Sequence, residues 1–165
     1  MAISHDDRRF LIRCDEVKAM SHDPHRQVGV VIVGTEGTVI AEGTNAPPSA
    51  FGLNHLETQM EISNDPSWKY FMLEHAERNA IFSAHNRGIS LAGATMYGSL
   101  FPCADCARAM VAVGISRVVV STADNDPRRD EKWRDHYKYA RLVFELGGVS
   151  VELVERSDTT RSKVG

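Results

Sequence analysis

Apolar residues recur along this chain with two different periods, and the alternation of these periods predicts an α/β fold. Continuous β-branched runs and alternating apolar residues, bounded by glycine or polar turns, are typical of strands. These patterns predict strands at residues 27–33, 38–43, 94–100, 117–121 and 149–153. Apolar residues at helical spacing predict helices in four further segments, which are residues 4–21, 70–88, 102–114 and 133–147.

The order of these elements predicts a single sheet with helices on both of its faces. The chain begins with a helix and an antiparallel hairpin, then repeats helix and strand three times through parallel crossovers. We therefore expect a three-layer α/β/α fold around a mixed five-stranded sheet, in one domain at residues 1–156 followed by a polar tail at residues 157–165. Residues 45–69 break the periodicity and predict a long loop or partly helical excursion, which is usually functional in a domain of this size.

Composition and charge narrow the class of protein. The 165 residues are 42% hydrophobic and 25% charged, which is globular composition. The net charge of −3 provides no overall basic field and argues against a nucleic-acid partner. No apolar run approaches the ~20 residues of a membrane helix, and the charged N-terminal stretch is unlike a signal peptide. With three cysteines, an odd number, a disulfide framework is not expected, so we predict a cytoplasmic protein without membrane partners.

Two short segments carry candidate chemistry, because each falls at the predicted start of a helix in a sheet of this kind. One is His75-Ala-Glu77, and the other is Pro102-Cys-Ala-Asp-Cys106. The C-x-x-C pair alone is ambiguous, since it is compatible with a redox pair, half of a structural zinc site or two packed thiols. A lone histidine is most often a packed side chain, and a lone glutamate is most often a solvated charge.

Taken together, the two segments predict a catalytic zinc site. Cys103 and Cys106 are expected to share one face at the start of a helix, where thiolates are favoured over thiols. His75 adds a third ligand, and three protein ligands with one open position are the pattern of catalytic zinc. Glu77 can then act as a proton shuttle without binding the metal. Because Cys14 is the remaining cysteine, we expect one zinc ion per chain.

The pattern H-x-E followed by P-C-x-x-C is the zinc deaminase signature, and residues 23–153 resemble the cytidine/deoxycytidylate deaminase superfamily. The stretches most similar to the deoxycytidylate (dCMP) deaminases are residues 23–33, 43–48, 75–81 and 100–107. The resemblance implies a homo-oligomer, either a dimer or a hexamer, and a small nucleotide substrate. The resemblance assigns the zinc ligands to His75, Cys103 and Cys106, and the proton shuttle to Glu77. It also assigns a contact with the substrate to Asn45, and the backbone N–H that binds the pyrimidine carbonyl to Ala76.

Some positions depart from the family pattern. Thr44 and Ala46 stand where the family commonly has an aromatic residue and a glycine. Glu74 replaces a histidine that helps some members to bind a second zinc, and residues 46–70 contain no cysteine, so no second zinc is expected. Arg26 is the candidate for binding a substrate phosphate, with Lys69 or Arg78 as the next candidates. Trp133 is either a wall of the base pocket or part of the apolar stripe of its helix.

These observations favour a hydrolytic zinc deaminase that converts dCMP to dUMP, or CMP to UMP, with release of ammonia. A second hypothesis keeps the chemistry and changes the substrate to cytosine, cytidine, guanine or adenosine in tRNA. A third, from another class, is a non-catalytic interaction module stabilised by zinc. Glu77 argues against this module, because a structural zinc site has no use for a carboxylate that is not a ligand.

Overall fold

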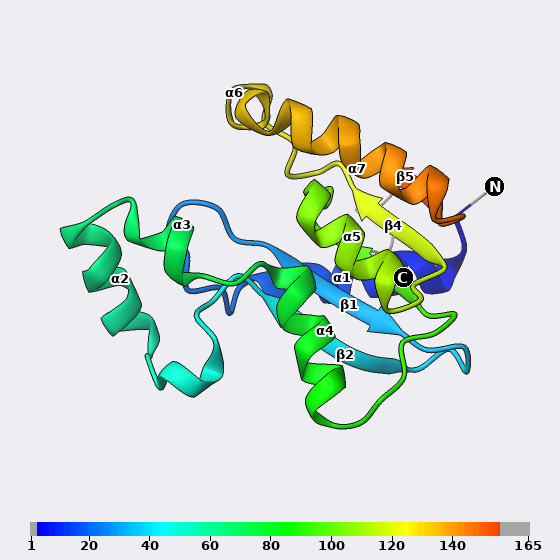
Figure 1. The fold of residues 1–165 in the computed structure, drawn as a ribbon, viewed down its shortest axis with the longest axis horizontal. Helices are drawn as coiled ribbons and strands as arrows, with labels where there is room; N and C mark the ends of the chain where they lie inside the picture. Colours follow the sequence, from blue (N-terminus) through cyan, green and yellow to red (C-terminus); the bar gives the residue numbers. More distant parts are fainter. Residues whose placement is uncertain (1–2, 156–165) are drawn as a thin grey trace, which may run out of the picture.

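Five strands form one mixed sheet in the computed structural model, which describes residues 3–155 (Figure 1). They are β1 (Gly29–Val33), β2 (Val39–Thr44), β3 (Thr95–Gly98), β4 (Arg117–Ser121) and β5 (Ser150–Val154), in the spatial order β2-β1-β3-β4-β5. Strand β1 is antiparallel to both of its neighbours, β2 and β3, whereas β4 is parallel to both of its neighbours, β3 and β5. The predicted mixed sheet is therefore confirmed. The predicted tail, residues 157–165, lies outside the described residues.

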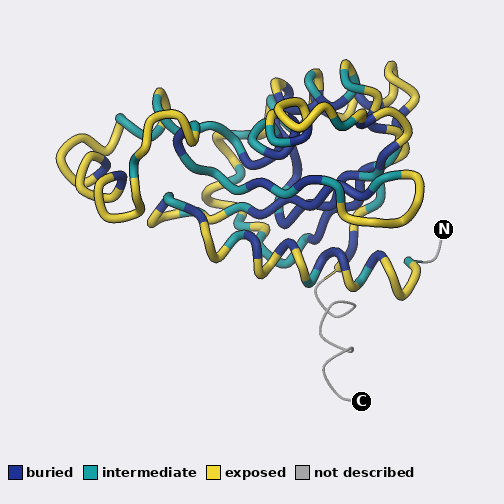
Figure 2. The backbone as a smooth tube through the Cα atoms, turned by 90° about the horizontal axis from the view of Figure 1, so that it is seen from below, coloured by how far each residue is buried: buried dark blue, intermediate teal, exposed yellow. Residues whose placement is uncertain are grey.

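Helices cover both faces of the sheet, as predicted (Figures 1 and 2). The α-helices of the described residues are α1 (His5–Lys18), α2 (His55–Asn64), α3 (Trp68–Met72), α4 (Ala76–Asn86), α5 (Ala104–Ala112), α6 (Pro127–Asp130) and α7 (Arg134–Leu146). Helix α1 packs on one face of the sheet, and α4, α5 and α7 lie on the other. The predicted excursion contains the 3₁₀ turn η1 (Ser49–Phe51) and α2, and with α3 it extends beyond the edge of the sheet. No helix among residues 3–155 is long and apolar enough to cross a membrane.

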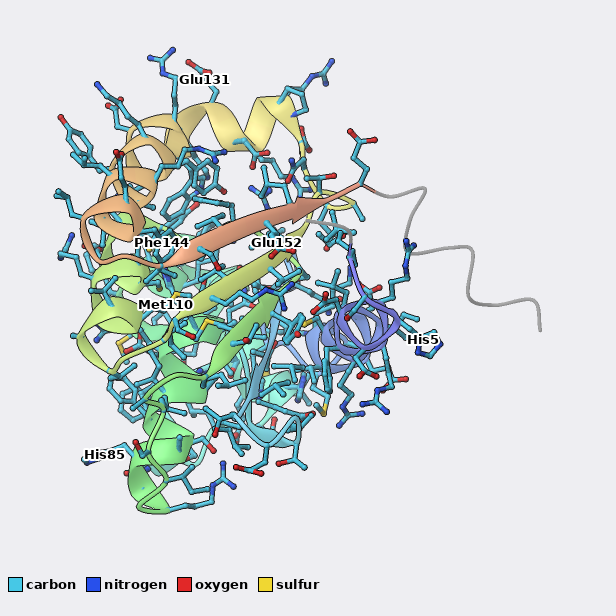
Figure 3. The ribbon with its side chains drawn as sticks, turned by 90° about the vertical axis from the view of Figure 1, so that its right-hand side faces the viewer. His5, His85, Met110, Glu131, Phe144 and Glu152 are labelled. Carbon is cyan, nitrogen blue, oxygen red and sulfur yellow. The ribbon has the colours of Figure 1, made fainter. Side chains whose placement is uncertain are left out.

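Alternate residues of the buried strands enter two separate clusters of the core. In β1, Val31 packs with the residues of α1, whereas Ile32 packs with the residues of α4, α5 and α7. Met110 and Phe144 are fully buried between their helices and the sheet, while the labelled His85 points outward (Figure 3). The period of two that predicted the strands therefore also sorts their side chains between the two faces.

The helix predicted at residues 70–88 is wrong as a single element. Helix α3 ends at Met72 and α4 begins at Ala76, and the three residues between them are not helical. Glu74 and Ala46 exchange two backbone hydrogen bonds, of 3.0 and 3.3 Å, which hold this segment against the loop that follows β2. Pairing with a distant segment overrides the local helical preference. The break places His75 at the start of a helix rather than inside one.

The helix predicted to open at Pro102 begins two residues later. Cys103 has an extended backbone (φ −72°, ψ 168°) and caps α5, so Pro102 lies outside the helix. The expectation that both cysteines occupy helical positions is therefore wrong for Cys103. The residues 133–147 that were predicted as one helix correspond to α7, which follows α6 and the 3₁₀ turn η2 (Glu131–Trp133).

A buried carboxylate ties α1 to the sheet. Asp7 is 3% exposed and accepts hydrogen bonds from both terminal nitrogens of Arg117, at 2.7 and 3.1 Å, and from the hydroxyl of Tyr97 at 2.7 Å. The Arg117 guanidinium holds the pKa of Asp7 well below its usual range. Arg117 also pairs with Glu152 at 2.9 Å, so one arginine on β4 links α1 to β5.

We expect Asp7→Asn to lower the free energy of unfolding by roughly 3 kcal/mol at pH 7, because the substitution leaves Arg117 without its buried partner. The folded pKa of Asp7 lies below the unfolded value of about 3.9. The stabilisation is therefore present above that value and is lost as the pH falls through the folded pKa. Urea unfolding of both proteins should show a difference that shrinks as the pH is lowered below about 4.

Glu16→Gln is a matched control, because it removes the charge of an exposed partner of Arg13. An exposed ion pair contributes at most about 1 kcal/mol, so this variant should remain close to the wild type. Equal stability of Asp7→Asn and the wild type at pH 7 would contradict the account.

Candidate metal centre and active site

Helices α4 and α5 begin close to each other on one face of the sheet. His75 caps α4 and Cys103 caps α5, and both residues have extended backbones, with ψ of 152° and 168°. Asn79, on the first turns of α4, donates hydrogen bonds to the carbonyls of Thr44 and Ala46, at 2.8 and 3.2 Å. The start of α4 is therefore fixed to the end of β2, and its capping histidine faces the capping cysteine of α5.

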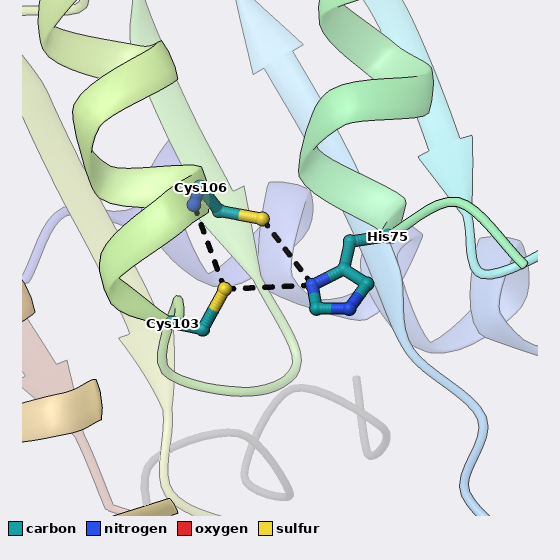
Figure 4. A group of neighbouring side chains, drawn as sticks. All are labelled: His75, Cys103 and Cys106. Atoms are coloured by element: carbon teal, nitrogen blue, oxygen red, sulfur yellow. Dashed lines mark hydrogen bonds between the residues drawn. The ribbon is translucent and has the colours of Figure 1, made fainter. Parts of the chain in front are cut away.

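His75, Cys103 and Cys106 form a close group (Figure 4). Nδ1 of His75 lies 3.5 Å from Sγ of Cys103 and 3.4 Å from Sγ of Cys106. In a tetrahedral zinc site, the usual Zn–N and Zn–S bond lengths place a nitrogen and a sulfur ligand about 3.5 Å apart. The spacing of this group therefore fits one zinc ion, and its soft and borderline donors suit zinc chemically.

The three side chains of this group change one another's pKa values. Hydrogen bonds from Cys106 and His75 lower the pKa of Cys103 to about 4, so this sulfur is a thiolate at neutral pH. The hydrogen bond with that sulfur raises the pKa of His75 to about 9. The hydrogen bond with Cys103 raises the pKa of Cys106 as well, so His75 and Cys106 hold protons that a metal ion would displace on binding all three groups.

Glu77 lies in the first turn of α4, two residues beyond His75. Its side chain lines the same pocket and is 6% exposed. Burial raises the pKa of Glu77 above its usual value. A buried carboxyl group with a raised pKa, beside a metal group that does not include it, is suited to receiving and delivering protons.

One pocket of about 690 Å³ contains nearly every predicted site residue. The predicted residues that line it are Arg26, Asn45, His75, Ala76, Glu77 and Cys103. Cys106 is fully buried and is absent from the lining. The start of β1, the end of β2 and the starts of α4 and α5 meet at this cavity. They bring together residues that are more than 70 positions apart in the chain.

Asn45 holds the loop at residues 21–28 against the end of β2. Its Oδ1 accepts from the Ser21 hydroxyl at 2.6 Å and from the Val28 backbone N–H at 2.9 Å, and its Nδ2 donates to the Arg26 carbonyl at 2.8 Å. One amide hydrogen of Asn45 has no hydrogen bond to the residues that the structure describes. The Asn45 side chain therefore holds the pocket wall together, and one of its amide hydrogens is still available to a ligand.

Arg26 is held by one side of its guanidinium group and is open on the other. Nη2 donates to Asp130 at 2.6 Å, whereas Nη1 is buried and has no hydrogen-bond partner among residues 3–155. A buried N–H group without a partner costs free energy, and such groups commonly mark a ligand site. The neighbouring Lys69 lines the pocket but already pairs with both carboxylate oxygens of Asp23, and Arg78 is not part of the lining.

Trp133 lies in the pocket wall rather than in the apolar core that the helices cover. Its ring is 6.2 Å from the His75 ring in an edge-on arrangement. Tyr137 also lines the pocket, and it could not be predicted as a site residue because its spacing matched the apolar stripe. The role of Asp130 was not predicted either, since its pairing with Arg26 joins residues that are far apart in the chain.

Known proteins are similar to this chain. The family model of the cytidine and deoxycytidylate deaminase zinc-binding region matches residues 4–122. Deoxycytidylate deaminase of Homo sapiens is 33% identical over 130 residues, which cover 79% of this chain and 68% of that protein. A probable deoxycytidylate deaminase of Drosophila melanogaster is 35% identical over 137 residues, covering 80% of this chain and 63% of that protein.

A solved structure shows the same fold. The dCMP deaminase from the cyanophage S-TIM5, in complex with dCMP and dUMP, matches with a TM-score of 0.68 at 21% identity. The match covers 93% of this chain and 100% of that one.

The fold, the His/Cys/Cys group and the buried Glu77 define the class of protein as a zinc-binding hydrolytic deaminase. The chain belongs to the cytidine and deoxycytidylate deaminase family. The resemblance, the zinc cofactor and the enzyme class that were expected from the sequence are confirmed. The role of each site residue stays a prediction.

We predict about one tightly bound zinc ion per chain, because the geometry offers one set of three close ligands among residues 75–106. Replacing both Cys103 and Cys106 by alanine should reduce the zinc content after dialysis to nearly none. Elemental analysis of the purified proteins measures this directly.

Cys14→Ala is the matched control, since Cys14 is a buried cysteine in the core beneath α1 and should not affect the zinc content. Zinc that persists in the double variant, or two tightly held ions per wild-type chain, would refute the assignment.

Proposed function

We propose that this chain removes the exocyclic amine of a cytosine nucleotide by hydrolysis, with dCMP as its substrate and dUMP and ammonia as its products. CMP is the neighbouring possibility within the same class of substrate. The observation that carries the proposal is one pocket lined by the metal group, by a buried Glu77 and by an arginine with an unpartnered nitrogen. The deoxycytidylate deaminases among the relatives support the deoxynucleotide.

Hydrolysis at C4 of cytosine needs activated water, and this activation is the chemistry that zinc supplies when His75, Cys103 and Cys106 hold it. Glu77 takes a proton from the water and delivers it to N3 of the ring. It then takes the second proton, from the hydroxyl group now on C4, and delivers it to the departing amine. The backbone N–H of Ala76 is the first of α4 and has no partner within the helix, so it is available to the pyrimidine carbonyl.

The pocket walls explain how a pyrimidine ring would be held. Trp133 and His75 meet edge to face, so a flat ring placed beside them would contact the indole. The remaining amide hydrogen of Asn45 is available to the sugar or the base. These contacts orient the ring without taking part in the chemistry.

The phosphate is the feature that separates a nucleotide from a nucleoside. A buried phosphate dianion needs cationic partners, and Nη1 of Arg26 is available for one charge-assisted hydrogen bond. Asp130 holds the other nitrogen at 2.6 Å and so keeps the guanidinium in place. A deaminase of free cytosine or of a nucleoside would have no use for this buried and half-satisfied arginine.

We propose further that residues 1–156 act as one deaminase domain, that the protein is a homo-oligomer and that it works in the cytoplasm. The family resemblance supports the homo-oligomer, and the net charge of −3 supports a small substrate rather than a polynucleotide. An interaction module without activity remains the remote alternative, and the buried Glu77 argues against it.

We expect Glu77→Gln to reduce the turnover of dCMP by about 10²–10⁴-fold while zinc stays bound, because glutamine keeps the shape of the side chain and cannot carry a proton. Ammonia release and zinc content are measured on the same sample. Glu57→Gln, on the exposed face of α2, is the control and should leave both values unchanged. Wild-type turnover in Glu77→Gln would show that the shuttle is a different group.

We expect the wild type to use dCMP more efficiently than deoxycytidine, and Arg26→Ala to narrow this difference. Loss of one charge-assisted contact should lower kcat/KM for dCMP about 10- to 100-fold and affect deoxycytidine much less. The measurement is ammonia release from dCMP, CMP, deoxycytidine, cytosine, guanine and adenosine. Arg128→Ala is the control, since Arg128 is an exposed arginine of α6 that does not line the pocket.

Two results would count against this account in different ways. Equal efficiency of the wild type on dCMP and deoxycytidine would defeat the nucleotide as substrate and favour the nucleoside or free base. A preference for dCMP that survives Arg26→Ala would keep the substrate and move the phosphate contact to another residue, with Lys69 as the first to test.

A further inference from the structure

His136, in the first turn of α7, reaches the amino end of α5. The backbone N–H of Ala104 donates a hydrogen bond to Nδ1 of His136 at 3.3 Å. The first N–H groups of a helix have no partner within the helix, and Cys103 Sγ accepts that of Cys106. His136 therefore provides α5 with a second cap, next to the residue that carries the metal-binding sulfur.

The same ring supports the pocket wall. The rings of His136 and Trp133 are 5.3 Å apart, and Trp133 in turn lies 6.2 Å from the ring of His75. Three rings thus run from the cap of α4, through the pocket wall, to the cap of α5. His136 is the residue of this series that contacts both the wall and the α5 terminus.

The surroundings of His136 favour a supporting role over a second metal site. The ligand atoms of Cys103, Asp105 and His136 lie within 4.8 Å of one another. Asp105 is exposed and pairs with Arg108, and Nδ1 of His136 is occupied by the N–H of Ala104. Groups that surround metal ligands in this way fix the orientation of those ligands.

We propose that His136 is a positioning residue for the deaminase reaction. Through Nδ1 it fixes the start of α5 and with it the sulfur of Cys103, and through its ring it holds Trp133 against the pocket. His136 itself does not touch the substrate. The proposal rests on the proposed function, because it assumes that Cys103 binds zinc and that Trp133 contacts the base.

Two substitutions separate these contacts. His136→Phe keeps an aromatic ring beside Trp133 and removes the acceptor of the Ala104 N–H. His136→Asn keeps an acceptor at the same distance from the backbone and removes the ring. Lys138→Ala, at an exposed position of the same helix, is the control. Each protein is measured for zinc loss to a chelator, for the thiolate absorption of its cobalt form, and for kcat and KM with dCMP.

We expect His136→Phe to lose zinc about 10-fold faster than the wild type and to shift the cobalt–thiolate absorption, as is usual when a group that supports a metal ligand is lost. His136→Asn should retain zinc within about twofold and raise KM about three- to tenfold with little change in kcat, because the wall loses an aromatic contact. Lys138→Ala should match the wild type in every measurement.

Unchanged zinc loss and an unchanged cobalt spectrum in His136→Phe would overturn the role of Nδ1. An unchanged KM in His136→Asn would overturn the role of the ring. Equal defects in both variants would show that His136 contributes only its volume to the packing. Circular dichroism verifies folding, and if the larger ring is not accommodated, His136→Leu, which also lacks the acceptor, replaces the phenylalanine variant in the metal measurements alone. The metal measurements need no substrate, so they stand even if dCMP proves to be the wrong nucleotide.

Discussion

The close approach of α4 to β2 is the constraint on which the site depends. A side chain at Gly43 would overlap the carbonyl oxygen of Ala76 and lie 2.5 Å from the backbone nitrogen of Ala80, so β2 accepts α4 at this depth because residue 43 is a glycine. Asn79 fixes the same helix along its length by binding the carbonyls that follow β2. Without this contact, the capping histidine of α4 would not reach the sulfurs of α5.

Once the helix starts are fixed, the chemistry follows from burial. His75 and Cys103 are hydrogen-bonded in a space where their ordinary solvation is removed, and a cation there would be bound by all the donors together. Glu77 is buried beside them, which raises its pKa and suits it to proton transfer. Arg26 is also prepared for a ligand, since Asp130 holds Nη2 and the buried Nη1 is left without a partner among the described residues.

Local patterns predicted most of the fold, because the spacing of apolar residues within each segment of this chain indicates whether it forms a strand or a helix, as in the buried run of β1. The metal group was predictable for the same reason, since its ligands fall in two short segments. The break before His75 was not, because it depends on hydrogen bonds between Glu74 and the distant Ala46. The partners of Arg26 and the place of Trp133 likewise depend on tertiary packing, which no spacing along the chain reports.

The reaction proposed for this pocket replaces the exocyclic amine of a cytosine nucleotide by an oxygen atom from water. Incubation of the zinc-loaded wild type with dCMP in water enriched in oxygen-18 tests the claim directly, with the product analysed by mass spectrometry. We expect dUMP that carries one oxygen-18 atom in its base, together with one ammonia for each dCMP consumed. Unconverted dCMP, or dUMP without the heavy oxygen, would contradict it.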